Sequence, residues 1–353
     1  MAMGGAKAHK VFLALLAMIA AGIPAYAGGL DNMRAGVAAR ERGDHAEAIR
    51  DFTRALEADD LSIVAKAIVY NDRGLAYEAE RQYDRAIADY NAALGLKPDF
   101  AEVYVNRGKA FAEKGEYDRV ISDFSAAIRL NHESADAYEN RGTAYLLKGE
   151  FDKAISDFDN AIRLRPGDLE GYYNRAGAYY YKGEYRKAIG DLSKIIRRKP
   201  NDAIAYRMRG NARFFSREFA AAATDYERCL TIDPSNSYVV LWLYLSRARM
   251  GKKDTASHAR YAAKVDRENW PGPIVALYFG DATPEQVAIA ATKGDADAQR
   301  EHGCEAEFYL GEYALTRHDR DGAAKLLHQA LETCPQSFLE YGAARSELLR
   351  MGE

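Results

Sequence analysis

The sequence lacks the residue patterns on which most catalytic sites depend. Its seven histidines are scattered over 353 residues, and it has no glycine-rich phosphate loop, no Cys-x-x-Cys pair and no His-Glu-x-x-His motif. The segment 318–322 begins like a calcium-binding loop, but the ligand pattern does not continue, which favours a polar turn between helices. We therefore expect a non-enzymatic protein without a cofactor or a bound metal.

Excess charge and long apolar runs are scarce as well. A formal net charge of -3 without a basic tail disfavours nucleic acid as a partner. The apolar run 11–21 follows two lysines, and it is shorter than the roughly 20 residues that span a bilayer. It precedes a small-x-small motif ending at Ala27, so residues 1–27 are predicted to be a signal peptide cleaved after Ala27. The mature chain would then be periplasmic or secreted, without stable membrane insertion; the alternative is a retained N-terminal anchor.

What the sequence does contain is an internal repeat. A phrase built around Asn-Arg-Gly recurs, and its small residue returns every 34 residues, at Gly74, Gly108, Gly142, Ala176 and Gly210. A fixed period of this length is typical of a solenoid, in which identical helical or strand units stack on one another. Such a chain presents a long surface on which other proteins bind.

Each repeat predicts two helices, here called helix A and helix B, joined by a turn. Counted from the first residue of a repeat, large residues at positions 4, 11 and 24 alternate with small ones at 8, 20 and 27, so the helices can interdigitate. In the repeat that starts at Ala135 these residues are Tyr138, Tyr145, Phe158, Gly142, Ala154 and Ala161. Gly149 is expected to supply a left-handed cap between the helices, and Pro166 to end helix B.

The repeat pattern also divides the chain into regions. A helical array over 28–268 is predicted to hold repeats near 29–62, 67–100, 101–134, 135–168, 169–202 and 203–236, with a degenerate seventh at 237–268. Residues 269–303 are expected to form an irregular connector with one short helix that begins after Thr283. Residues 304–353 are expected to form a last repeat-like pair and a capping helix.

The spaced positions resemble the tetratricopeptide repeat (TPR). In the repeat starting at Ala67 the matching residues are Tyr70, Gly74, Tyr77, Ala86, Tyr90, Ala93 and Pro98. The resemblance implies an all-α fold, a right-handed superhelical solenoid of about seven to eight helix-turn-helix repeats with a C-terminal capping helix. It also implies that helix A of each repeat lines a concave face, which binds a protein or peptide partner.

An arginine and an aspartate recur together, at positions 7 and 23 of five repeats. The pairs are Arg73 with Asp89, Arg107 with Asp123, Arg141 with Asp157, Arg175 with Asp191, and Arg209 with Asp225. Because the two positions lie on facing helices, we expect ion pairs within each repeat rather than a basic binding surface.

Two groups of residues are candidates for partner binding. Position 6 is asparagine in three consecutive repeats, at Asn106, Asn140 and Asn174. An asparagine ladder can pair with the main chain of an extended peptide, and this one resembles the ladder of the O-linked GlcNAc transferase superhelix. The alternative is that these asparagines help to pack helix A.

The second group is aromatic and lies in repeats 5 and 6, at Tyr173, Tyr180, Tyr181, Phe214 and Phe215. The repeat pattern does not require these side chains in the core, and exposed aromatic clusters favour recognition. They predict a binding surface for a protein segment, or for a glycan whose sugar faces stack on the rings. Packing against a neighbouring repeat is the alternative.

The three cysteines fall at interpretable positions. Cys229 replaces the small residue at position 27, so it is expected to be buried. Cys304 and Cys334 open helix A and close helix B of the last pair, where antiparallel helices bring them together, so a disulfide is predicted. The alternatives are two free thiols, or a metal site of His302 and Cys304 for which further ligands are lacking.

The C-terminal part is similar to the tail of the NlpI family of Gram-negative lipoproteins. The resemblance rests on the segments 270–280, with its Trp-Pro break, and 307–313. Members of that family are TPR adaptors that bring cell-wall hydrolases to a periplasmic protease and work as homodimers. The resemblance implies a periplasmic scaffold or adaptor and a homodimer, although this chain has more repeats and lacks the lipid-bearing cysteine. An envelope or secretion assembly factor and a peptidoglycan- or polysaccharide-binding module are the alternatives.

Overall fold

The computed structural model describes residues 28–251, 260–335 and 338–353, and in these ranges every regular element is an α-helix. The predicted signal peptide, 1–27, lies outside the described residues. None of the described helices is both long and apolar enough to cross a membrane. The chain divides between Leu164 and Arg165 into two compact units.

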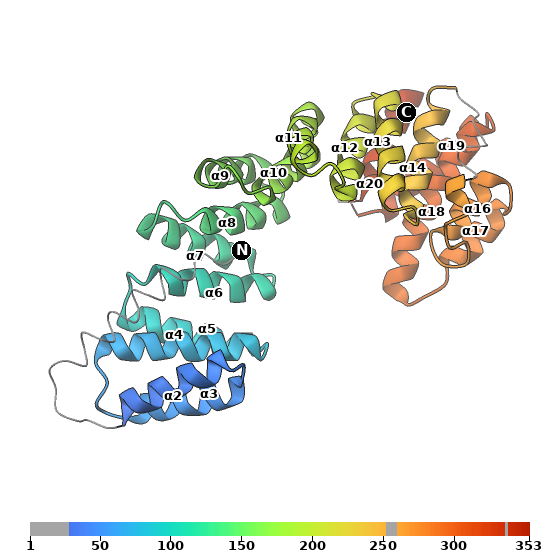
Figure 1. Cartoon of the computed structure of the whole chain (residues 1–353). Helices are drawn as coiled ribbons and strands as arrows, with labels where there is room; N and C mark the ends of the chain where they lie inside the picture. Colours follow the sequence, from blue (N-terminus) through green and yellow to red (C-terminus); the bar gives the residue numbers. More distant parts are fainter. Residues whose placement is uncertain (1–27, 252–259, 336–337) are drawn as a thin grey trace. The chain divides into compact units, whose positions relative to one another are not determined.

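The first unit is a stack of antiparallel helix pairs (Figure 1). Its helices are α2 (Gly29–Glu41), α3 (His45–Glu57), α4 (Ile63–Ala79), α5 (Tyr83–Leu96), α6 (Ala101–Glu113), α7 (Tyr117–Leu130), α8 (Ala135–Leu147) and α9 (Phe151–Leu164). The extra residues before the second repeat lengthen α4, which begins at Ile63 with Ser62 as its cap. Gly149 has a φ of 74°, as a left-handed cap requires.

Small and large residues meet inside each repeat as the pattern predicts. A Cβ atom added to Gly74 would lie 2.6 Å from the ring of Tyr90, so only glycine permits this approach of α4 and α5. In the fifth repeat the glycine is replaced by Ala176, and the aromatic residue opposite is replaced by the smaller Leu192. A larger residue on helix A is thus matched by a smaller one on helix B, so the helix crossing stays closely packed.

The expected arginine–aspartate ion pairs are confirmed in all five repeats. Each is bidentate, as in Arg141, whose Nε and Nη2 donate to the Asp157 carboxylate at 2.8 and 2.7 Å. The other pairs are Arg73–Asp89, Arg107–Asp123, Arg175–Asp191 and Arg209–Asp225. The remaining nitrogen of Arg141 donates to Ser125 of the preceding repeat, so the arginine also joins successive repeats.

The second unit continues the repeats and adds a helical C-terminal region. Its helices are α10 (Glu170–Tyr181), α11 (Tyr185–Arg198), α12 (Ala203–Phe215), α13 (Phe219–Ile232), α14 (Ser237–Ala248), α16 (Gly272–Phe279), α17 (Pro284–Ala291), α18 (Ala296–Thr316), α19 (Arg320–Thr333) and α20 (Leu339–Met351). The second half of the predicted seventh repeat includes 252–259, outside the described residues.

The region 269–303 is more helical than predicted. The short helix after Thr283 is α17, and the expected capping box between Thr283 and Gln286 is present. However, α16 forms where irregular chain was predicted, because Pro273 stands in its first turn, where proline is tolerated. The long helix α18 begins at Ala296, two turns before the start predicted near Cys304.

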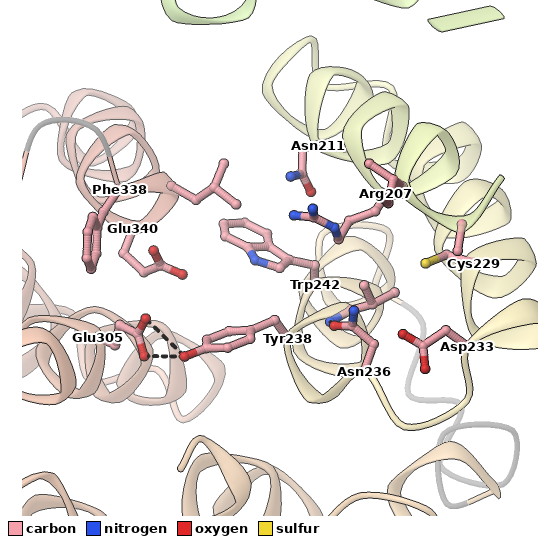
Figure 2. A pocket seen from close by; sticks show the side chains of 14 residues that line it. Arg207, Asn211, Cys229, Asp233, Asn236, Tyr238, Trp242, Glu305, Phe338 and Glu340 are labelled. Carbon is pink, nitrogen blue, oxygen red and sulfur yellow. Dashed lines mark hydrogen bonds between the residues drawn. The ribbon is translucent and has the colours of Figure 1, made fainter. Parts of the chain in front are cut away.

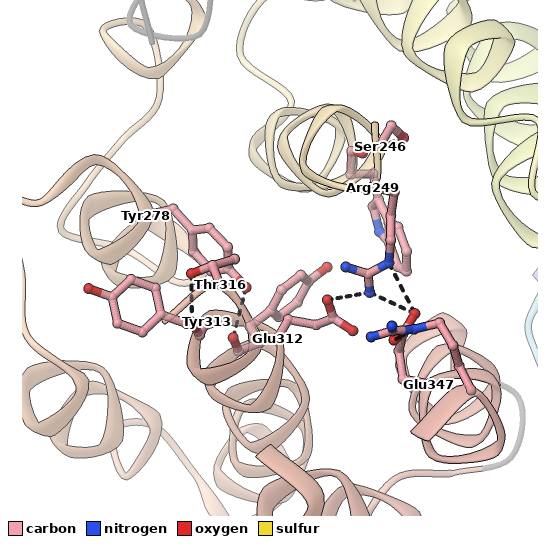
Figure 3. A network of polar contacts seen from close by, with 10 residues as sticks. Ser246, Arg249, Tyr278, Glu312, Tyr313, Thr316 and Glu347 are labelled. Carbon is pink, nitrogen blue, oxygen red and sulfur yellow. Dashed lines mark hydrogen bonds and ion pairs between the residues drawn. The ribbon is translucent and has the colours of Figure 1, made fainter. Parts of the chain in front are cut away.

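Helices α18 and α20 pack against the A helices of repeats 6 and 7, which are α12 and α14. The Trp242 indole on α14 stacks on Phe308 of α18 with ring centroids 5.9 Å apart, and Phe215 of α12 faces Gly342 of α20. Arg249 follows α14 and pairs with Glu312 of α18 and Glu347 of α20 at 2.6 and 2.7 Å (Figure 3). One hydrophobic core therefore joins these repeats to the C-terminal helices.

Cys304 and Cys334 are joined by a disulfide, with 4.8 Å between their Cα atoms. The bridge links α18 to the residue that follows α19, so it closes the last helix pair. Cys229 is a buried free thiol, and burial raises its pKa to about 11.

Candidate functional site

The face formed by helix A is open in the first unit and covered in part of the second. At position 9 of the repeat, Lys109 and Thr143 are exposed in repeats 3 and 4. The equivalent residues of repeats 6 and 7, Asn211 and Leu245, are buried, because α18 and α20 occupy that side of the array. A partner can therefore reach the A-helix surface of the first unit without displacing any part of this unit.

The three asparagines of the predicted ladder do not have equivalent environments. Asn106 is 8% exposed and donates from its Nδ2 to the Oδ1 of Asn71 in the preceding repeat, at 2.9 Å. Asn140 donates from its Nδ2 to the main-chain oxygen of Asp136 at 2.7 Å. Asn174 is half-buried on α10 of the second unit. The ladder prediction is wrong for Asn106, whose amide is committed to packing between repeats.

We expect replacement of Asn106 by alanine to lower the free energy of unfolding by about 1–3 kcal/mol, because the buried Asn71 loses its partner. Lys109→Ala, an exposed change on the same helix, is the matched control and is expected to alter stability by about 0.5 kcal/mol or less. Urea denaturation followed by circular dichroism measures both. Equal stabilities for the two variants would show that the Asn106–Asn71 contact contributes nothing.

The predicted aromatic surface is largely part of the core. Phe214 is buried, with its ring centroid 5.0 Å from that of Trp242. Tyr180 and Phe215 pack edge to face at 5.7 Å. Tyr173 is half-buried, and Tyr181 is 50% exposed. The prediction of a free aromatic surface is wrong for Phe214 and Phe215, because the C-terminal helices and repeat 7 supply the packing partners that the repeat pattern does not show.

A pocket of about 470 Å³ lies where α12 and α14 meet the C-terminal helices α18 and α20 (Figure 2). Its polar lining residues are Arg207, Asn211, Asp233, Asn236, Tyr238, Trp242, Glu305 and Glu340, and its apolar ones include Ile204, Phe338 and Leu339. The lining comes from the sixth repeat, from Tyr238, Val239 and Trp242 of the seventh, and from the C-terminal helices α18 and α20 with Phe338 before α20. Sequence reasoning missed it because its walls come from segments about 100 residues apart.

Two buried carboxylates form one wall of this pocket. Glu305 is 8% exposed, and its carboxylate accepts hydrogen bonds from the Tyr238 hydroxyl at 2.8 Å and from the Trp270 indole at 2.6 Å. Glu340 is 5% exposed and accepts one from the Tyr309 hydroxyl at 3.0 Å. Burial, together with the nearby charge of Glu305, raises the pKa of Glu340 to about 7.

The remaining walls carry hydrogen-bond donors. Trp242 is 2% exposed, and no described residue accepts a hydrogen bond from its Nε1. Arg207 of α12 lines the pocket opposite the carboxylates, and its guanidinium forms no ion pair with a described carboxylate (Figure 2). The pocket thus holds two buried carboxylates on the α18 and α20 side and donors from α12 and α14, with Asp233 after α13 as a further acceptor.

Comparison with known proteins identifies the repeats. Family models described as TPR repeat match residues 74–115 and 108–149, and models described as tetratricopeptide repeat match 135–168 and 173–237. Among solved structures, the C-terminal part of a TPR repeat-containing protein from Cytophaga hutchinsonii is 21% identical, covers 86% of this chain and 95% of its own, and has a TM-score of 0.52.

Two further structures are similar. A tetratricopeptide repeat protein from Parabacteroides merdae is 15% identical, covers 87% of this chain and 93% of its own, and has a TM-score of 0.51. YrrB, described as a TPR protein with an unusual peptide-binding site, is 22% identical over 54% of this chain and 95% of its own, with a TM-score of 0.48. At these identities the likeness to the Cytophaga hutchinsonii and Parabacteroides merdae structures establishes the fold.

Proposed function

We propose that this chain, a tetratricopeptide repeat protein, is a non-enzymatic scaffold that holds an extended segment of a protein partner against the A-helix face of repeats 3 and 4. The exposure of that face carries the proposal. Lys109 and Thr143 are exposed at position 9, and Leu147 at position 13 is 59% exposed. Leu147 therefore offers a partner an apolar contact beside the polar side chains at position 9.

The charge of this face favours a partner segment with basic residues. Glu102 and Asp136, at position 2 of the two repeats, are both exposed acids, against one exposed base at position 9, Lys109. Asp72 is buried on the preceding A helix, and burial raises its pKa to about 6, with the Arg40 guanidinium opposing the shift. Opposite charge on a partner would steer its encounter with the face and set its register along the helices.

We also propose that the chain works in the periplasm or outside the cell. The Cys304–Cys334 disulfide supports this, because structural disulfides persist in oxidising compartments. Cleavage after Ala27 would be checked by the mass of the mature protein. The resemblance of the tail to the NlpI family is the reason to propose further that the partners are a protease and cell-envelope hydrolases, and that the chain forms a homodimer.

A role in glycan binding has less support. Sugar rings stack on exposed aromatic faces, whereas Phe214 and Phe215 contact Trp242 and each other. Tyr181, half exposed, is the candidate that remains from the predicted aromatic group. If muropeptides added before irradiation leave the yield of the crosslinked protein partner unchanged, the glycan role is excluded in favour of the scaffold.

A photo-crosslinking residue placed at Lys109 tests the proposal. Lys109 lies on the A-helix face of repeat 3, and Ser122 is an exposed residue on helix B of the same repeat, so Ser122 is the matched control position. We expect a discrete crosslinked product at position 109 in the cells that make the protein, with the same partner segment identified by mass spectrometry in independent cultures. The same products from both positions, or none from either, would contradict the proposal.

A further inference from the structure

We propose that the pocket between α12, α14, α18 and α20 binds a basic side chain, lysine or arginine, of the partner, between the carboxylates of Glu305 and Glu340. This inference rests on the proposed function, because it assigns a second anchoring point for a partner segment. The pocket volume of about 470 Å³ lies within the range of roughly 300–1,000 Å³ found for small-ligand sites.

The carboxylates are the first reason. Both are buried, and they lie close enough for the charge of one to disfavour ionisation of the other. The hydroxyls and the indole that reach them are neutral donors, and burial raises the pKa of both carboxylates, although the nearby His302 opposes the shift at Glu305. Their negative charge is therefore not fully compensated. An ammonium or guanidinium group between them would supply that compensation, and no described basic side chain of α18 or α20 lines the pocket.

The aromatic walls are the second reason. Tyr238, Trp242 and Phe338 line the same pocket as the two carboxylates. A cation held against aromatic faces gains from their negative electrostatic potential, and the gain grows when the site is shielded from water. On the carboxylate side of the pocket an acidic side chain would gain nothing from these rings and would be repelled by both carboxylates, whereas Arg207, the basic residue of the lining, stands on the opposite wall.

The donor side of the pocket is the third reason, and it indicates a peptide rather than a free amine. The Nε1 of Trp242 is a buried donor without an acceptor among the described residues, an arrangement that is costly unless a ligand completes it. Arg207 and Asn211 stand on the α12 wall. The main-chain carbonyl groups of an extended segment are acceptors that fit this wall, while its basic side chain reaches the carboxylates.

The test compares blocked pentapeptides that differ in their central residue: lysine, norleucine or glutamate, each flanked by glycines. The two tryptophans of the chain both adjoin the site, since Trp242 lines the pocket and Trp270 donates to Glu305, so intrinsic fluorescence of the mature chain 28–353 reports binding. We expect the lysine peptide to bind at least about tenfold more tightly than the norleucine peptide, with no saturable binding of the glutamate peptide.

The matched variants are Glu305→Gln with Glu340→Gln in the pocket, and Glu332→Gln on the exposed surface of α19. The double variant should lose the preference for lysine, and the control should keep it. Equal binding of lysine and norleucine peptides to the unmodified chain would overturn the proposal, as would a preference for glutamate or a preference that survives the double variant. The comparison of peptides on the unmodified chain decides the matter even if the double variant fails to fold.

The pH dependence gives a second readout. Glu340 must be ionised to hold a cation, and its pKa is raised to about 7 by burial beside Glu305, with Tyr309 of α18 as its hydrogen-bond donor and Tyr238 of α14 nearby. Affinity for the lysine peptide should therefore rise as the pH passes upward through about 7 and level off above it. Crosslinking at Lys109 does not depend on this pocket, so the two proposals fail separately.

Discussion

Replacing Arg249 by alanine is expected to lower the free energy of unfolding of the second unit by about 3–5 kcal/mol, which would be among the largest effects of any single substitution in this chain. The side chain pairs with Glu312 and Glu347, which are 1% and 9% exposed (Figure 3). Burial raises the pKa of Glu312, and Arg249 opposes that shift. Without the arginine, two carboxylates would remain in the contact between α14, α18 and α20 with little to compensate their charge.

The control for this prediction is Arg350→Ala. Arg350 also binds Glu347, at 2.6 Å, but it is 44% exposed, so its loss should cost about 1 kcal/mol or less. Urea denaturation followed by tryptophan fluorescence measures both variants, because both tryptophans lie in the second unit. The deficit of Arg249→Ala should shrink as the pH falls through the raised pKa of Glu312, which lies above 4.5, the ordinary value for glutamate, because a protonated carboxyl needs no cation. Equal losses for the two variants would contradict the prediction.

Asp225→Ala is expected to destabilise the second unit by a similar amount, about 3–5 kcal/mol. The Asp225 side chain is 2% exposed and receives two hydrogen bonds from Arg209 and a third from Arg213, at 2.7–2.9 Å. Removing it leaves two guanidinium groups without their carboxylate between α12 and α13. Asp281→Ala removes an exposed ion pair with Arg267 and serves as the control, with an expected change of about 1 kcal/mol or less.

Asp225→Ala also tests whether the arginines at position 7 of the repeats stabilise the fold or bind the partner. If the arginines at position 7 serve stability, Asp225→Ala should lower the midpoint of denaturation and leave crosslinking at Lys109 unchanged under conditions where the protein is folded. A variant with unchanged stability and lost partner binding would instead assign these arginines to the partner.

The sequence determined the repeat itself, because the interactions that build a repeat are local. Gly74 and Tyr90, or Arg141 and Asp157, are 16 residues apart on two helices joined by a short turn. Their periodic recurrence shows that they face each other, and steric fit and charge leave little choice of geometry. The capping box at Thr283 was equally readable, because its partner Gln286 is three residues away.

What surrounds the side chains that point away from the core of their own repeat was decided only by the tertiary structure. The repeat pattern does not require Phe214 and Phe215 in the core of their own repeat. It does not reveal that helices more than 80 residues later in the chain cover that side of helix A. For the same reason Asn106 looked like part of a free ladder, although Asn71 of the preceding repeat binds it. The pocket of Glu305 and Glu340 is the clearest case, because two carboxylates become a site only when distant helices bury them together. Periodicity determines which way a side chain points, whereas what lies opposite it depends on contacts between segments remote in the chain.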